Sequence, residues 1–165
     1  MEDLQAVVLA AATFTMGLVA GVFVLYAHTI MSGLAKTDDR TFVGAFQALD
    51  RAIINPWFMI FGFLGAPVLT AAAAVLFLGD TGFVLLAGAL ALYAVTFVVT
   101  VGINVPKNDE LKAAGDPDQI DVTAARAAFD EGAWVQWNRL RVITTTGAFG
   151  LLCWALLVHG ANNYR

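Results

Sequence analysis

The polar side chains of this sequence gather at the ends of long apolar stretches, and their types are those of acid–base chemistry. They are His28, Asn55, Asn104, Asn108, Asp109, Asn138 and Arg141, with Trp57, Trp134 and Trp137 beside them. A histidine or a carboxylate can remove a proton from carbon, and amide or guanidinium groups can stabilise the oxyanion that forms. Tryptophan rings can line a pocket for a flat apolar molecule. These groups can act together only if the fold brings the ends of the apolar stretches to one surface.

Composition predicts an integral membrane protein. Of the 165 residues, 59 % are hydrophobic and 13 % charged, and the mean hydropathy is +0.75. Four stretches lack charged residues, at 4–35, 52–79, 81–106 and 142–164. Each can supply the roughly 20 apolar residues that a helix needs to cross a bilayer, and none shows the alternation of a membrane barrel. We predict an all-α, four-helix transmembrane bundle, a single domain over 1–165, with helices at about 4–32, 54–79, 82–105 and 138–160.

The basic residues predict the orientation of this bundle. Eight of the nine lysines and arginines lie at 36–51 and 107–141, in or beside the two long connections, and only Arg165 lies on the other side. Basic residues near helix ends stay on the cytoplasmic side. We therefore expect a multi-pass protein of the cell (inner) membrane with cytoplasmic connections and both termini outside. The net charge of −4 gives no reason to expect nucleic acid as a partner.

Both connections contain patterns typical of short interfacial helices. In the first, Thr37 and two aspartates predict a helix start. An apolar stripe follows at spacings of three and four, formed by Phe42, Phe46, Leu49 and Ile53. In the second connection, Asp116-Pro117 predicts a start before Val122, Ala125 and Phe129.

His28 is predicted to face the interior of the bundle. On an ideal helix it lies within about 20° of the face that carries Gly17 and Gly21, since each residue turns the helix by about 100°. Two small residues four apart allow a neighbouring helix to approach closely. An ionisable group on such a face is a candidate base, and the alternative is a histidine with a structural hydrogen bond.

The segments NPW, at 55–57, and INVPKND, at 103–109, each combine asparagine with proline. Asn55 can cap a helix that Pro56 begins, and Trp57 suits the membrane interface. Pro106 predicts that the third helix bends or ends near Asn104, which leaves carbonyl groups in need of donors. The asparagines there either terminate the helix or donate to a ligand.

The segment WVQWNRLR, at 134–141, places a stripe of residues at spacings of four, three and four. The stripe consists of Trp134, Asn138, Arg141 and Thr145, and Trp137 adjoins it. Such spacing puts all of them on one helical face. Arg141 either extends its charge toward the bilayer surface or clamps an anion such as an enolate.

The residue inventory argues against bound cofactors. Cys153 is the single cysteine, which excludes dithiol chemistry within one chain, and His159 is the only histidine besides His28. One histidine at each end of the bundle cannot form a bis-histidine haem site or a three-histidine metal site. A metal site built from His28 and Asp109 would have few ligands. We predict no metal and no cofactor.

Four segments together resemble the anthrone oxygenase-like family of small four-helix membrane proteins. They are AGVF in the first helix, NPWF at 55–58, NVPKND at 104–109 and WVQWNRLR at 134–141. Fungal members oxidise anthrones to anthraquinones, so the resemblance implies an oxygenase. It carries over Asn55, Asn104, Asn108, Trp137, Asn138 and Arg141 as site residues, whereas His28 is proposed on geometry alone.

The resemblance and the inventory predict a membrane-embedded, cofactor-independent oxygenase. Its substrates would be a hydrophobic aromatic molecule and dioxygen, both of which partition into lipid. His28 or Asp109 would be the base, asparagines and Arg141 the oxyanion donors, and the tryptophans the walls. The alternative is a non-catalytic membrane protein that binds lipid or quinone or serves as an assembly partner. The 15 glycines permit tight internal packing and homo-oligomers alike.

Overall fold

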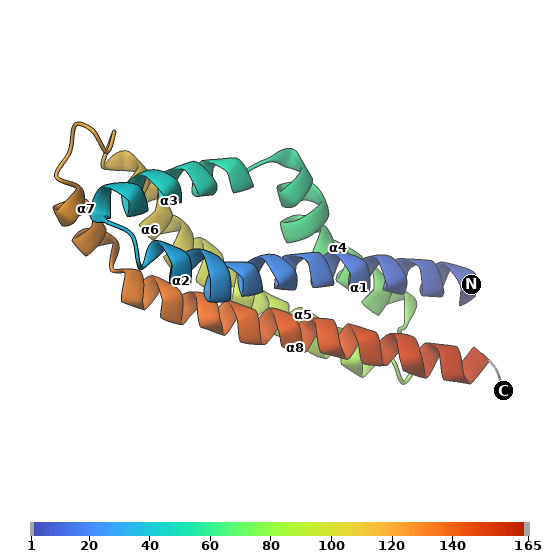
Figure 1. Ribbon diagram of the computed structural model, residues 1–165. Coiled ribbons are helices and arrows are strands. Elements are labelled where there is room, and N and C mark those ends of the chain that lie inside the picture. Colours follow the sequence, from blue (N-terminus) through green and yellow to red (C-terminus); the bar gives the residue numbers. More distant parts are fainter. Residues whose placement is uncertain (1, 164–165) are drawn as a thin grey trace.

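The computed structural model describes residues 2–163 and is helical throughout, with no strand among these residues (Figure 1). Four helical segments are long and apolar enough to cross a membrane: Glu2–Leu34, Trp57–Leu76, Phe83–Ala113 and Val122–Ala161. The all-α, four-helix membrane fold that the sequence predicts is therefore confirmed. Arg165, the predicted marker of the other face, lies outside the described residues.

The four segments contain both α-helical and π-helical (η) pieces. In chain order the elements are α1 (Glu2–Leu25), η1 (Tyr26–Ile30), α2 (Met31–Leu34), α3 (Asp39–Ile53), η2 (Trp57–Leu64), α4 (Gly65–Leu76), α5 (Phe83–Val99), η3 (Thr100–Asn104), α6 (Val105–Ala113), α7 (Val122–Phe129) and α8 (Glu131–Asn163). One end of the bundle, the connection end, carries α2, α3, α6 and α7 (Figure 1). The opposite terminal end carries the beginning of α1, the end of α8 and the turn between α4 and α5.

The third segment continues past Pro106 instead of ending near Asn104, so the prediction of an ending there is wrong. The helix runs through η3 into α6 and stops only after Ala113. The π-helical η3 ends two residues before the proline, and such local widening lets a helix accommodate a proline without breaking. The residues of INVPKND therefore lie within one continuous helix.

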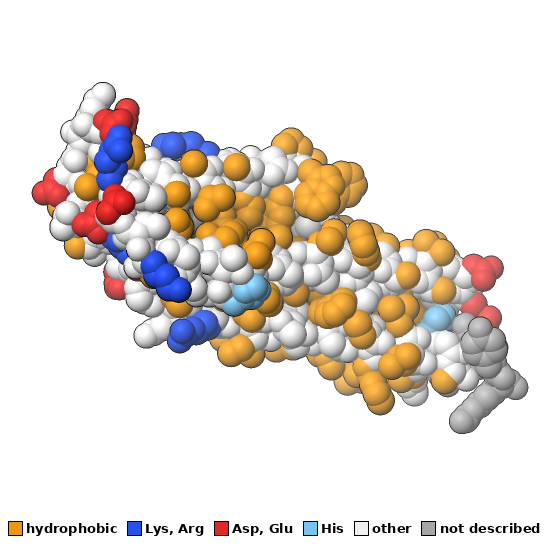
Figure 2. Space-filling model, viewed as in Figure 1, with side chains coloured by type: hydrophobic (Ala, Val, Ile, Leu, Met, Phe, Trp, Pro, Cys, Tyr) orange, Lys and Arg blue, Asp and Glu red, His pale blue; other side chains and the backbone are white. Residues whose placement is uncertain are grey.

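The bundle core toward the terminal end is built mainly from small and aliphatic side chains of α1, α4, α5 and α8, with the buried aromatic residues Phe77 and Tyr93 among them. Leu9, Leu86, Ala89, Ala148 and Leu152 are fully buried in it. Hydrophobic side chains also cover the outside of this half, as Figure 2 shows along the length of the helices. An apolar exterior around an apolar core is the surface that a bilayer requires.

The connection end has its own aromatic core under α3 and α7. Phe42, Phe46, Phe129 and Trp134 are buried against one another, with the Phe46 and Phe129 rings 4.7 Å apart. Asp38 caps α3 by accepting a hydrogen bond from the Thr41 amide at 2.9 Å. That bond lowers the pKa of Asp38, because it favours the ionised carboxylate. The predicted helices of both connections are thus present.

Two details of these helices differ from the sequence prediction. Helix α7 begins after Asp121, whose carboxylate accepts from the Ala124 amide, whereas Asp116 closes a turn by accepting from the Asp118 amide. An aspartate before a proline suits a turn as well as a helix start. On α3, Leu49 is exposed and Asp50 is buried, so the buried stripe passes through a carboxylate.

Candidate functional site

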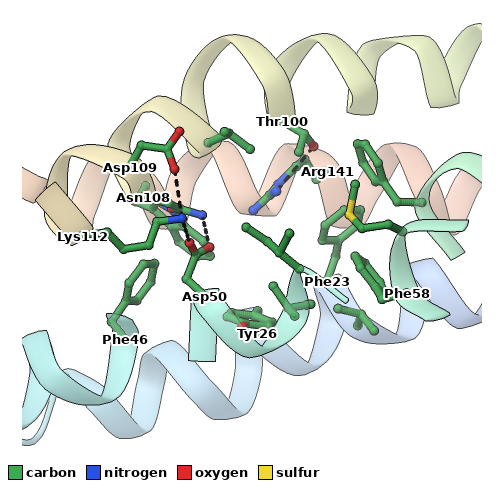
Figure 3. A pocket seen from close by; sticks show the side chains of 17 residues that line it. Phe23, Tyr26, Phe46, Asp50, Phe58, Thr100, Asn108, Asp109, Lys112 and Arg141 are labelled. Carbon is green, nitrogen blue, oxygen red and sulfur yellow. Dashed lines mark hydrogen bonds and ion pairs between the residues drawn. The ribbon is translucent and has the colours of Figure 1, made fainter. Parts of the chain in front are cut away.

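A cavity of about 230 Å³ lies between the two cores, toward the connection end (Figure 3). Its walls come from α1, η1, α3, η2, η3, α6 and α8. The lining is mostly apolar and aromatic, from Val22, Phe23, Phe46, Ile53, Ile54, Phe58, Met59, Phe63, Val105 and Trp134. The polar lining residues are Tyr26, Asp50, Thr100, Asn108, Asp109, Lys112 and Arg141. An apolar cavity with a few polar groups is the usual form of a small-molecule site.

Arg141 projects from α8 into the middle of the cavity (Figure 3) and is only 5 % exposed. Its guanidinium lies over the Phe23 ring, 4.5 Å from the centroid, and 5.3 Å from that of Trp134. One guanidinium nitrogen donates to Asn138 Oδ1 at 2.9 Å and another is 3.4 Å from Thr100 Oγ1, while the buried Nε has no partner. No carboxylate among the described residues pairs with it. A buried cation held only by neutral groups and aromatic rings is suited to an anionic ligand.

A second polar group lies nearer the connection end, around Asp50 of α3. The two carboxylate oxygens contact different partners on α6: Oδ1 accepts from Asn108 Nδ2 at 2.6 Å, and Oδ2 is 2.6 Å from Lys112 Nζ. Lys112 also pairs with Asp109 at 2.9 Å. The group therefore links α3 to α6, and Figure 3 shows it to the left of Arg141.

Trp134 connects the two polar groups. Its indole nitrogen donates to Asn108 Oδ1 at 2.7 Å, which leaves the Asn108 amide nitrogen facing Asp50. Its ring lies beside Arg141 and is 6.1 Å from the ring of Tyr26. Tyr26 lines the α1 side of the cavity, and its hydroxyl makes no hydrogen bond to another described residue.

The structure brings four of the predicted site residues to the cavity wall. These are Asn108, Asp109, Trp134 and Arg141. Asn104 and Asn138 are fully buried behind the wall and link helices: Asn104 Nδ2 is 3.4 Å from the Trp134 carbonyl, and Asn138 Nδ2 is 3.3 Å from that of Phe23. Asn138 also holds Arg141. The predicted stripe of α8 residues is thus one buried face. Both asparagines donate to backbone carbonyls of residues that line the cavity, Trp134 and Phe23.

His28 lies outside the cavity, and the prediction that it faces the bundle interior is wrong. Its side chain is exposed, with Nδ1 2.6 Å from the hydroxyl of neighbouring Thr29. The cavity is lined by Tyr26, and residues two apart on a helix point about 200° apart. Gly17 does approach α8, where an added Cβ would meet Phe149 at 2.9 Å, but Gly21 has open space around it. The glycine face is therefore not the cavity face.

The other three predicted residues, Asn55, Trp57 and Trp137, also do not line the cavity. Asn55 performs the capping role that the sequence left open: its Oδ1 accepts from the Phe58 amide at 3.0 Å, and its Nδ2 donates to the Ala52 carbonyl at 2.9 Å. Trp57 is 58 % exposed and Trp137 is 39 % exposed, and neither lines the wall. Exposed tryptophans near helix ends suit a membrane interface.

Sequence reasoning missed Tyr26, Asp50, Thr100 and Lys112. The sequence does contain a signal for Asp50, because it follows Phe42 and Phe46 at spacings of four on the apolar face of α3. A carboxylate on such a face needs a buried partner. Lys112 is four residues after Asn108 and therefore on the same side of α6. Nothing local marks Tyr26 or Thr100.

The described residues contain no group of three or more His, Cys, Asp and Glu side chains placed to hold a metal ion. The carboxylates nearest the cavity are occupied by Lys112, and the single cysteine, Cys153, is half-buried on α8. The polar groups that line the cavity can form hydrogen bonds and stabilise charge.

Fold and cavity define a membrane-type four-helix protein with an apolar cavity that carries a few polar groups. Residues 57–151 match the family model described as anthrone oxygenase, and this match covers more than half of the chain. The chain therefore belongs to the anthrone oxygenase family, as its motifs suggested, and membership indicates an oxygenase-type function. Neither a curated protein nor a solved structure matches the chain. The matched range includes Asn108, Lys112, Trp134 and Arg141, whereas α1 and α3 lie before it.

Proposed function

We propose that the chain is a membrane-embedded oxygenase that oxidises a hydrophobic, anthrone-type aromatic with dioxygen and without metal or flavin. One observation carries the proposal. Arg141, a buried cation with no carboxylate partner among the described residues, lines an apolar cavity. A site of this kind favours a flat apolar molecule that becomes anionic during its reaction.

The chemistry needs only acid–base groups and an oxyanion site. An anthrone has an acidic methylene opposite its ketone, and loss of one methylene proton gives an anion delocalised onto the ketone oxygen. This electron-rich anion transfers electrons to dioxygen, and a carbon–oxygen bond forms to give a peroxide. Loss of the second methylene hydrogen with cleavage of the oxygen–oxygen bond leaves a new carbonyl and water. One anthrone and one dioxygen thus give one anthraquinone and one water.

Arg141 supports this reaction by binding the oxyanion. Its guanidinium is a fixed donor in a water-poor environment, where a preorganised donor stabilises developing charge most strongly. Phe23, Phe58 and Trp134 provide aromatic wall around the ring system of the substrate. Asn138 fixes the orientation of the guanidinium from behind, so its contribution to the reaction is indirect.

We place substrate entry on the lipid side of the cavity. Ile54 and Val105 line the cavity and remain partly exposed, on α3's end and on α6 respectively. Figure 2 shows hydrophobic side chains around the hollow between α3 and α1. An apolar substrate and dioxygen both concentrate in a bilayer. The excess of basic residues at the connection end supports a cytoplasmic position for that end.

A second candidate is a non-catalytic protein that binds a quinone or lipid in the same cavity. The observation in its favour is that Asn104 and Asn138 join helices and do not line the cavity. Two of the predicted donors thus stabilise the bundle, as expected of an assembly or binding protein. A quinone carbonyl can also accept a hydrogen bond from the Arg141 guanidinium.

Oxygen uptake separates the two candidates. The protein in lipid nanodiscs, supplied with a hydroxylated anthrone, is expected to consume oxygen faster than a protein-free blank. His28→Ala is the matched control, and it should keep the wild-type rate because His28 is exposed outside the cavity. Uptake no faster than the blank, together with saturable binding of a quinone, would favour the binding protein.

A further inference from the structure

We infer that Asp50 is the general base of the proposed reaction and removes the methylene proton of the substrate. The inference rests on the proposed function and assigns a catalytic role to a residue outside the range that matches the family model. It is drawn from the position of one carboxylate in the cavity relative to Arg141 and to the other ionisable groups.

Asp50 meets the structural conditions for a base. Its side chain is 9 % exposed, lines the cavity and lies at the end of the buried stripe of α3. Asn108 and Lys112 each contact a different carboxylate oxygen, which holds the group in one orientation. A carboxylate has about four lone-pair sites on its two oxygens, so sites remain for a substrate proton.

The placement of Asp50 relative to Arg141 matches the substrate. Asp50 and Arg141 line one cavity from different helices, α3 and α8, and Figure 3 shows the Asp50 carboxylate and the Arg141 guanidinium as separate groups on its wall. The ketone and the methylene of an anthrone occupy opposite positions of its middle ring. When the ketone oxygen binds Arg141, the methylene lies at the other edge of the middle ring, and Asp50 is the buried carboxylate of the cavity wall that would accept its proton. Related proton abstraction from carbon uses the same pairing of an aspartate base with an oxyanion site.

The other ionisable groups fit this role less well. Asp109 lines the cavity rim, but its side chain is 62 % exposed and already pairs with Lys112. Lys112 is held as a cation between two carboxylates and has no lone pair to accept a proton. His28 points away from the cavity. Asp50 is thus the buried carboxylate that faces the apolar space.

The proton balance returns Asp50 to its ionised form. The carboxylate first takes a methylene proton and later gives it to the peroxide anion that forms on the same carbon. It then takes the second proton from that carbon as the oxygen–oxygen bond breaks and hydroxide leaves. Hydroxide accepts this proton and departs as water. Dioxygen is the only oxidant, and no net proton is gained or lost by the protein.

Hydrogen–deuterium exchange without oxygen tests the assignment directly. Wild-type protein in nanodiscs is given a hydroxylated anthrone in D₂O under anaerobic conditions, and deuterium entry at the methylene is followed by mass spectrometry. The wild-type protein should accelerate exchange over the blank, and Asp50→Asn should lose this acceleration by about 10²-fold or more, the usual contribution of a general base. Substrate affinity, measured by quenching of tryptophan fluorescence, should change little. Asp118→Asn is the matched control and should keep the wild-type exchange, because Asp118 is exposed, pairs with Arg40 and does not line the cavity.

Asp50→Glu is the second variant, since it retains a carboxylate for Asn108 and Lys112. Its exchange rate should fall between those of the wild type and Asp50→Asn, because a longer side chain displaces the base. Exchange at the wild-type rate in Asp50→Asn, or in Asp50→Glu if the first variant does not fold, would overturn the assignment. So would a wild-type protein that exchanges no faster than the blank.

The outcome for Asp50 is separable from the outcome for the proposed function. Anaerobic exchange that depends on Asp50, without oxygen uptake in air, would keep the base and refute the oxygenase. Oxygen uptake at the wild-type rate in Asp50→Asn would keep the oxygenase and refute the base.

Discussion

The two halves of the bundle solve the problem of buried polar groups differently. Toward the terminal end, the buried polar residues are mostly threonines whose hydroxyls donate to carbonyls of their own helix, as Thr13 does to Leu9 and Thr70 to Ala66. Toward the connection end, the buried polar groups include an arginine, an aspartate and two asparagines that contact other helices. The first arrangement needs nothing beyond the helix, whereas the second depends on several helices and surrounds a cavity.

This difference separates stability from function. Packing of small and aliphatic side chains is the main source of helix association when lipid replaces water around a bundle. Buried charges cost free energy in the same environment unless they are well paired. The connection end carries such a charge, Arg141, without a carboxylate partner among the described residues. We therefore expect substitutions at the connection end to affect turnover and those at the terminal end to affect stability.

Arg141→Gln should give the largest functional effect. The amide of glutamine can still contact Asn138 but cannot supply the charge, so turnover should fall by about 10²- to 10³-fold, as for loss of an oxyanion donor. Thermal unfolding in detergent should occur no earlier than in the parent, because an isolated buried charge has been removed. Early unfolding with an unchanged rate per folded molecule would instead assign Arg141 to the assembly of the bundle.

Leu152→Ala should reverse this pattern. Leu152 is fully buried in the core of the terminal half, and its truncation leaves a cavity in that core. The free energy of unfolding should fall by about 2–5 kcal/mol, the usual loss for a buried leucine. Oxygen uptake per folded molecule should stay at the parent value. A fall in turnover as large as that of Arg141→Gln would show that the two halves are coupled.

The contrast between the halves also explains what the sequence could predict. Long charge-free stretches predict membrane helices because the bilayer imposes the same length on each. The α8 stripe was predicted because α8 is regular from Trp134 to Thr145, so spacing alone fixes a common face. Four of the predicted site residues reached the cavity for this reason and because their helix ends share one level of the bundle.

The errors arose where a helix is irregular or where two faces of a helix are both buried. INVPKND does not end its helix because the π-helical η3 precedes Pro106, and no local motif announces such a turn. The position of His28 was predicted from the face that carries Gly17 and Gly21. That face packs on α8 at Gly17, whereas a different face of α1 lines the cavity. Asp50 was not predicted because its buried position depends on Asn108 and Lys112 of α6. The spacing of residues along one helix does not reveal a contact between segments that are far apart in the sequence.

The glycines of α1 offer the smallest but most closely matched comparison. Gly17 and Gly21 share one helix and are four residues apart, yet an added Cβ at Gly17 would meet the Phe149 ring at 2.9 Å, whereas one at Gly21 meets nothing within 4 Å. Gly17→Ala should therefore destabilise the α1–α8 contact by about 1–3 kcal/mol, the cost of overpacking. Gly21→Ala should leave stability unchanged or raise it by up to about 1 kcal/mol, since alanine favours a helix more than glycine does.

Thermal unfolding of both variants in detergent, with the oligomeric state measured by light scattering, tests this pair. Equal losses would contradict the open space around Gly21 and would mean that another surface covers it. A loss in Gly21→Ala that accompanies a change from oligomer to monomer would identify that surface as a second copy of the chain. The predicted difference between the two glycines thus depends on α8 approaching α1 closely at Gly17 and not at Gly21.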